Sequence, residues 1–220
     1  MANPYSSLKI FHHRDALDKI RRDEQFAPFY IRLKPTNICN HHCSYCTYGS
    51  GDTHNKTDNR NNIRHTDMIP CGKMQEIIND MGDMGVKAVT FSGGGEPLTY
   101  PHIVEAVNMM KERSIDLSLI TNGQLLDGER AEAFYNAKWL RVSFDSPNPS
   151  EYAALRGISE SSFHKVVANI ENFARKKEPD CVLGVNFVVG KANSLWGGAV
   201  RGAVPWHIAR KRSGGCLLCG

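Results

Sequence analysis

The chain is 220 residues long, with 41% hydrophobic and 23% charged residues, a composition typical of a soluble protein with one sizeable hydrophobic core. No apolar run reaches the roughly 18–20 residues that cross a bilayer, and the N-terminus has no apolar stretch of the signal-peptide kind, so a cytoplasmic location is expected. The net charge of +4 comes entirely from residues 194–220, which leaves the rest of the chain without the basic surface that nucleic acid would need.

Residues 1–27 are polar, of mixed charge and compatible with a helix, and we predict that they form an N-terminal helical extension. From Phe29 apolar and polar residues alternate in FYIRLKPT, which predicts a first strand. A long polar loop is expected over 47–69. It is followed by a helix over 71–84, where apolar residues recur at helical spacing and which Gly85 ends.

The same alternation continues along the chain. Strands are predicted in VKAVTFSG, IDLSLITNG, WLRVSFDS and CVLGVNFVVG, and the helices between them begin at Pro101, span 127–137, and run as one longer stretch to about Arg175. Such βα units predict a parallel sheet with right-handed crossovers. Periodicity does not decide between a barrel and a doubly wound sheet. In both, functional groups gather at the carboxyl ends of the strands.

Three of the seven cysteines are crowded together directly after the first predicted strand. An odd number of cysteines in a reducing compartment favours metal or redox chemistry over disulfides. Cys39, Cys43 and Cys46 have the spacing C-x3-C-x2-C, which can hold three irons of a [4Fe–4S] cube and leave the fourth open to a small ligand. The alternatives are a zinc ion held by these thiols with His41 or His42, and free thiols.

A glycine-rich turn, Ser92-Gly93-Gly94-Gly95-Glu96-Pro97, follows the second predicted strand. Glycines allow a backbone to approach a ligand closely and expose its N–H and C=O groups. A tight turn between a strand and a helix is the simpler explanation of this segment taken alone.

The two motifs together resemble the radical S-adenosylmethionine (SAM) superfamily over roughly residues 25–193. The resemblance rests on the cysteine spacing, on Tyr45 just before the third cysteine, and on Gly94-Gly95-Glu96 after the next strand. It implies an α/β fold, an incomplete (βα)6 TIM-like partial barrel with five βα units present. It also implies two cofactors, a [4Fe–4S] cluster and SAM, which chelates the open iron and is cleaved reductively to a radical that abstracts hydrogen from a substrate.

The resemblance also implies site residues. Weaker matches to the family stand at the ends of later strands. Taken alone, each such residue is more often structural, as a cap, a turn or a surface ion pair. Among them, Arg156 resembles an arginine that contacts the SAM carboxylate in some members. The predicted cofactor-binding residues are Tyr45, Gly94, Gly95, Glu96, Thr121, Ser143, Arg156 and Asn186, and the predicted cluster ligands are Cys39, Cys43 and Cys46. No catalytic residue is assigned beyond the cluster.

The expected partners are an external one-electron reductant of the flavodoxin or ferredoxin type and a peptide or small-molecule substrate that no residue identifies. No membrane and no nucleic acid are expected as partners. The alternative function is a non-catalytic zinc-binding module or an iron–sulfur electron-transfer module. Zinc would leave the Gly93–Glu96 turn without a role.

The sequence divides into the extension 1–27, a core over 28–193 and an atypical tail over 194–220. The tail contains no acidic residue, and the helix and sixth strand that would complete the family core are missing, which would leave the fifth strand with an unpaired edge. We interpret the tail as disordered and as the product of a truncated or shifted reading frame, which would make this copy inactive or poorly stable. Cys216 and Cys219 form an isolated CxxC there, whereas Cys71 and Cys181 are predicted to be packing residues.

Overall fold

The computed structural model of the chain describes residue 11 and residues 13–48, 64–190 and 193. The strands are β1 (Tyr30–Leu33), β2 (Ala88–Phe91), β3 (Asp116–Thr121), β4 (Trp139–Ser143) and β5 (Val182–Asn186). The helices are α1 (Arg14–Arg21), α2 (Cys71–Met84), α3 (Ile103–Glu112), α4 (Gly128–Glu132), α5 (Pro149–Arg156) and α6 (Glu160–Lys176), with a short 3-10 helix, η2 (Pro97–Thr99).

Several sequence predictions fall outside these described residues. They are the tail over 194–220 with Cys216 and Cys219, and residues 49–63 of the predicted loop. The extension over 1–27 is described only in part, where α1 has no buried residue and His13 touches Phe29 with ring centroids 4.1 Å apart. Across the ranges that the structure covers, none of the helices has both the length and the apolar character needed to cross a bilayer.

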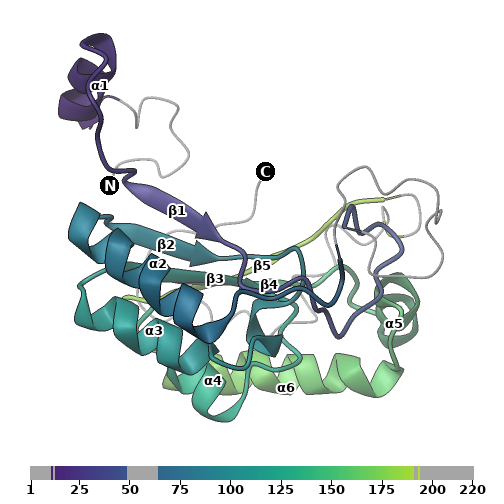
Figure 1. Ribbon diagram of the computed structural model, residues 1–220. Coiled ribbons are helices and arrows are strands. Elements are labelled where there is room, and N and C mark those ends of the chain that lie inside the picture. Colours follow the sequence, from purple (N-terminus) through teal and green to yellow (C-terminus); the bar gives the residue numbers. More distant parts are fainter. Residues whose placement is uncertain (1–10, 12, 49–63, 191–192, 194–220) are drawn as a thin grey trace.

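The sheet has the strand order β1-β2-β3-β4-β5, and every neighbouring pair is parallel. A doubly wound sheet reverses its strand order at a switch point, whereas here each new strand is added on the same side as the one before. Figure 1 shows α2, α3, α4 and α6 together on one side of the sheet. The predicted α/β architecture with a parallel sheet is therefore confirmed, and the strand order identifies it as the partial-barrel type.

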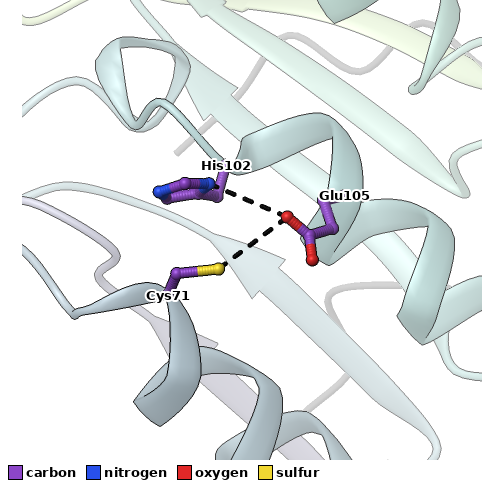
Figure 2. Close-up of side chains that lie close together, drawn as sticks. All are labelled: Cys71, His102 and Glu105. Carbon is purple, nitrogen blue, oxygen red and sulfur yellow. Dashed lines mark hydrogen bonds and ion pairs between the residues drawn. The ribbon is translucent and has the colours of Figure 1, made fainter.

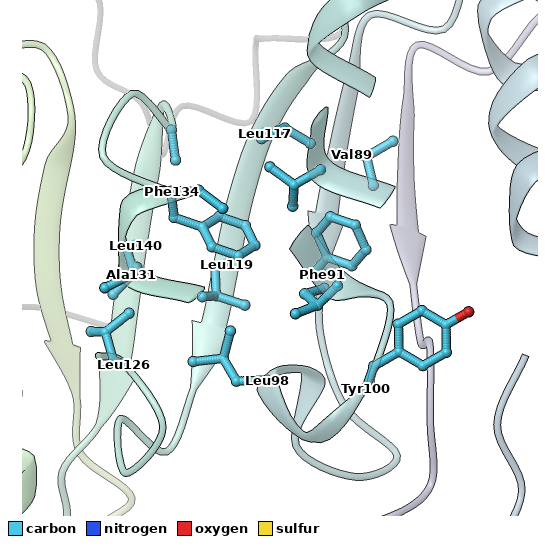
Figure 3. Packing of buried hydrophobic residues seen from close by; sticks show 14 of the residues in the cluster. Val89, Phe91, Leu98, Tyr100, Leu117, Leu119, Leu126, Ala131, Phe134 and Leu140 are labelled. Atoms are coloured by element: carbon cyan, nitrogen blue, oxygen red, sulfur yellow. The ribbon is translucent and has the colours of Figure 1, made fainter. Parts of the chain in front are cut away.

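The hydrophobic core lies between the sheet and these helices (Figure 3). Side chains alternate across a strand, so every second residue of the central strands points toward the helices. Those that Figure 3 labels on β2, β3 and β4 are buried, namely Val89, Phe91, Leu117, Leu119 and Leu140. From the helix side, the i, i+4, i+7 spacing of Met74, Ile78 and Met81 places all three in the core, as the sequence predicts for this helix.

The opposite face of the sheet is polar. Arg32, Thr90 and Ser118 stand side by side across β1, β2 and β3, because the strand register pairs Arg32 with Thr90 and Thr90 with Ser118. At the carboxyl end of this face Ser143 of β4 is paired with Asn186 of β5. In a barrel this is the inner face, and it carries groups that can bind a polar molecule.

The longer helical stretch that the sequence predicts up to Arg175 is two helices in the structure. α5 ends at Gly157, which has the left-handed φ of 61°, and α6 begins after Ser159. A methyl group at position 157 would lie 2.6 Å from the carbonyl oxygen of His42, so the break also lets the cysteine loop pass close to the end of α5. The helix predicted over 127–137 is shorter in the structure, where α4 ends at Glu132.

We expect Met81→Ala to lower the free energy of unfolding by about 2–5 kcal/mol, because it opens a cavity against the sheet. Met81 is 2% exposed, whereas Met84 in the same helix is 50% exposed. Met84→Ala is the matched control and should change stability by less than about 0.5 kcal/mol. Urea unfolding followed by circular dichroism measures both. Equal losses would contradict the placement of α2 on the sheet.

Candidate functional site

The three clustered cysteines lie in the loop that follows β1, at the carboxyl edge of the sheet. Cys43 is buried, Cys39 and Cys46 are partly exposed, and all three are free thiols. The loop is tight, since the Cys46 N–H donates to the Cys43 carbonyl at 3.1 Å. The pKa of the Cys39 thiol is raised to about 11, mainly by burial and to a smaller extent by the charges of Glu96, Cys43 and Cys46. The thiols therefore interact electrostatically, and bound cations would favour their ionised forms.

The spacing of these thiols argues against a single metal ion. Among the described residues, only one group of three or more potential ligands has all its ligand atoms within 4.8 Å of one another, and it contains none of these cysteines and neither His41 nor His42. A tetrahedral zinc ion needs its ligand atoms about 3.3–3.8 Å apart. A four-iron cube binds each thiolate at a different corner, so it suits more widely spaced thiols.

The glycine-rich turn after β2 packs directly on the cysteine loop. The Gly95 N–H donates to the Thr36 carbonyl at 3.0 Å, and the Glu96 N–H donates to the Ile38 carbonyl at 2.8 Å. A methyl group on Gly95 would lie 2.0 Å from the Ile38 oxygen, and one on Gly94 would lie 2.4 Å from Asn37 Oδ1. Glycine at these positions is therefore required for the approach of the two loops.

The Glu96 carboxylate points into the protein. It accepts hydrogen bonds from the Leu98 N–H at 3.0 Å, from the Thr121 hydroxyl at 2.7 Å and from the Asn122 N–H at 2.7 Å. Burial raises the pKa of this carboxyl group, and these three donors oppose the rise. Thr121 is itself 2% exposed and faces the helices. Glu96 and Thr121 therefore join the ends of β2 and β3, and neither side chain is directed toward the open face.

Two residues of the segment after β3, Asn122 and Gln124, contact the cysteine loop, and neither is among the site residues predicted from the sequence. Asn122 Nδ2 donates to Asn40 Oδ1 at 2.7 Å, and Gln124 Oε1 lies 2.6 Å from His41 Nε2. Burial, together with the charge of Arg156, lowers the pKa of His41 to about 4. The imidazole is thus neutral near pH 7. The T-N-G-Q order after a buried strand is the only sequence signal that could have indicated these contacts.

A buried polar network holds the loop from the other side. Arg156 Nη2 lies 2.5 Å from Asp145 Oδ2, with both side chains almost completely buried. The Tyr45 hydroxyl donates to the same carboxylate, and the Val188 N–H donates to its other oxygen at 2.9 Å. Arg156 Nη1 also donates to Cys43 Sγ at 3.6 Å. Two predicted residues, Tyr45 and Arg156, are therefore brought together by an aspartate that sequence reasoning did not select.

Arg156 has one donor atom, Nε, that takes no part in these contacts. Its Nε is buried and has no hydrogen-bond partner among the described residues. Because buried polar atoms are almost always bonded, this atom points to a ligand that carries an acceptor. Ser143 and Asn186 lie elsewhere on the rim, partly exposed at the ends of β4 and β5, where the polar face of the sheet opens.

A family model described as the Radical SAM superfamily matches residues 33–192 of the chain. The S-adenosylmethionine-dependent nucleotide dehydratase of Selenomonas ruminantium is 28% identical over 174 residues, which are 76% of this chain and 58% of that protein. GTP 3',8-cyclase of Alkaliphilus oremlandii is 32% identical over 127 residues, which are 56% of this chain and 37% of that protein. The chain thus spans less than two thirds of either relative.

The fold is similar to that of a solved structure. SuiB of Streptococcus suis bound to S-adenosylmethionine superposes with a TM-score of 0.57 at 18% identity, covering 89% of this chain and 41% of SuiB. At this level of identity the similarity concerns the fold alone.

We expect Gly95→Ala to lower the free energy of unfolding by about 1–3 kcal/mol or more, because the added methyl group forces the turn away from the cysteine loop. Gly72→Ala in α2 is the matched control, since a methyl group there meets nothing within 4 Å. It should be neutral or stabilising by up to about 1 kcal/mol. Urea unfolding distinguishes the two, and an equal response would contradict the close approach.

Asp145→Asn should lower the free energy of unfolding by about 3–5 kcal/mol, because it leaves the buried Arg156 guanidinium without its counter-charge. The control is Asp116→Asn, which breaks an exposed ion pair with Lys138 and should cost less than about 1 kcal/mol. Chemical denaturation at pH 7 measures both variants. A small loss for Asp145→Asn would show that Arg156 is not held by this carboxylate.

Proposed function

This chain belongs to the radical SAM superfamily, and we propose that it holds a [4Fe–4S] cluster on Cys39, Cys43 and Cys46 and cleaves SAM reductively. The observation that carries the proposal is the set of three free thiols at the carboxyl edge of the sheet. They are spaced too widely for one ion, and the backbone of the segment that leads into their loop is hydrogen-bonded to the glycine-rich turn. When bound and reduced, the cluster supplies the electron for SAM cleavage, which starts hydrogen abstraction from the substrate.

The chain's own residues position the loop and shape its charge. Asn122 and Gln124 bind the side chains of Asn40 and His41, which lie between the first two cysteines. Arg156 places a positive charge beside Cys43. Burial raises the pKa of the Cys43 thiol, and the charge of Arg156 opposes this rise and so favours the thiolate form. Hydrogen bonds to cluster sulfurs are one of the means by which proteins tune cluster potentials. We therefore assign Arg156 a role in tuning the cluster.

SAM would lie over the polar face, next to the glycine-rich turn. Because the Glu96 carboxylate is already bonded within the fold, we assign the contact with the SAM amino group to the backbone of Gly94 and Gly95. The free Nε of Arg156 suits the SAM carboxylate. We assign the contact with the ribose to Ser143 and Asn186, whose partly exposed positions at the ends of β4 and β5 support this role. Thr121 is directed away and supports the site through Glu96.

The substrate and the electron donor are the least defined parts of the reaction. The inner face of the sheet carries Arg32 and Arg141, which favours a substrate with anionic groups, whether a nucleotide-like small molecule or an acidic peptide. A flavodoxin or ferredoxin is the proposed reductant, and the cytoplasm, where thiols stay reduced, is the proposed location. The alternative function, a zinc-binding module, is less favoured, because within the described part of the chain these thiols are not grouped as closely as one zinc ion needs.

Anaerobic reconstitution of the full chain with iron and sulfide tests the proposal. We expect about four irons per chain and, with a low-potential reductant, release of 5′-deoxyadenosine from SAM. Cys46→Ala should lose both. Cys181→Ala is the control that should keep both, because Cys181 is buried in the core away from the loop.

Other outcomes separate the alternatives. One zinc per chain with no iron and no SAM cleavage would replace the proposal with the zinc-binding module. Four irons without SAM cleavage would identify an electron-transfer module instead. In both cases the fold and the family membership stand, and only the reaction is lost.

A further inference from the structure

A second group of metal-binding side chains lies outside the candidate site, where α2 and α3 begin. Cys71 is the first residue of α2, His102 directly precedes α3, and Glu105 lies in the first turn of α3. From the sequence, Cys71 is predicted to be a packing residue. The structure places it at the surface, partly exposed and outside the hydrophobic core, and Figure 2 shows it facing the other two side chains.

The ligand atoms of the three residues are close enough for one ion. All lie within 4.8 Å of one another. Cys71 Sγ is 3.8 Å from Glu105 Oε2, and His102 Nδ1 is 3.7 Å from the same oxygen (Figure 2). Around tetrahedral zinc, with bonds of about 2.0–2.3 Å, neighbouring ligand atoms stand about 3.3–3.5 Å apart. Small side-chain rotations close the remaining difference.

Surrounding contacts hold these side chains in place. Gln75 Nε2 donates to Glu105 Oε1 at 2.8 Å, which leaves Oε2 directed at the cysteine and the histidine. The Tyr100 hydroxyl donates to the Ile69 carbonyl at 2.8 Å, so the segments before α2 and α3 are tied together. The Tyr100 ring also packs edge-on against the imidazole of His102, with centroids 5.6 Å apart. Such supporting contacts around the ligands are typical of metal sites.

The charges of the group suit a cation. An ionised Cys71 thiol would lie beside the Glu105 carboxylate, with Sγ 3.8 Å from Oε2, and the two anionic groups would repel each other. The imidazole of His102 makes no capping hydrogen bond to α3, so it is available as a ligand. A divalent ion would offset the repulsion between Cys71 and Glu105 and leave all three groups paired.

We propose that Cys71, His102 and Glu105 bind one zinc ion and leave a fourth position for water. A set of one sulfur, one nitrogen and one oxygen suits zinc, whereas magnesium and calcium take oxygen ligands only. The ion joins the start of α2 to the start of α3. Because η2 and the Gly93–Glu96 turn lead directly into α3, the zinc site steadies the support of the cysteine loop. It does not depend on the chemistry proposed for that loop.

The test uses the full chain, reconstituted first with iron and sulfide so that the cysteine loop is occupied. Zinc is then added, excess is removed, and zinc and iron are counted by mass spectrometry. Zinc affinity is measured by competition with a chromogenic chelator. We expect Cys71→Ser and His102→Ala to weaken zinc binding at least 100-fold, and Gln75→Ala to weaken it about 10–100-fold. Iron content should stay at the parent level in all three, which also shows that they fold.

Glu112→Gln is the matched control for Glu105→Gln, since both glutamates are exposed and lie on α3. Only Glu105→Gln should weaken zinc binding. The proposal is overturned if the parent chain, once its iron–sulfur cluster is in place, binds no zinc. It is equally overturned if zinc content and affinity are the same in Cys71→Ser as in the parent, because the ion then lies elsewhere.

Discussion

The candidate site depends on one close approach of two backbones, between the cysteine loop and the turn over Gly93–Glu96. The Glu96 N–H reaches the Ile38 carbonyl at 2.8 Å, and there is no room for a methyl group on Gly95 beside that same oxygen. The glycines therefore have a structural reason that does not involve a ligand. The approach also fixes where Cys39 lies relative to the turn, so the packing of these glycines positions both segments of the candidate site.

A buried ion pair, Arg156–Asp145, contacts the cysteine loop on the side of Cys43. A buried ion pair such as Arg156–Asp145 gains little net stability, because both groups lose their water. Its value here is in geometry: the same guanidinium reaches Cys43 Sγ, and the carbonyl of Arg156 accepts from the His42 N–H at 2.8 Å. α5 can bring this residue to the loop only because Gly157 ends the helix there. The helix end at Gly157, the buried ion pair and the position of the cysteine loop therefore depend on one another.

Local patterns predicted most of the fold and selected the cysteines that we propose as cluster ligands. Alternation indicated the strands, helical spacing indicated the buried face of α2, and cysteine spacing singled out Cys39, Cys43 and Cys46. The supporting residues were missed because their roles exist only after folding. Asp145 reads as one more polar residue after a strand, although it collects three partners from distant segments. Thr121 was expected to face a ligand, and the strand register turns it toward the helices instead.

Under the two proposals, the spacing of the candidate ligand atoms would keep the iron–sulfur cluster and the zinc ion at separate sites. The thiols after β1 are spread too widely for one ion, and they come from a single loop whose backbone is fixed by neighbouring strands. The group at Cys71 is compact and chemically mixed, and it comes from two helices. A cube needs several soft ligands at its corners, whereas a single zinc ion needs few ligands at close range. The geometry of each group of candidate ligands therefore suits its own proposed metal better than the metal proposed for the other group.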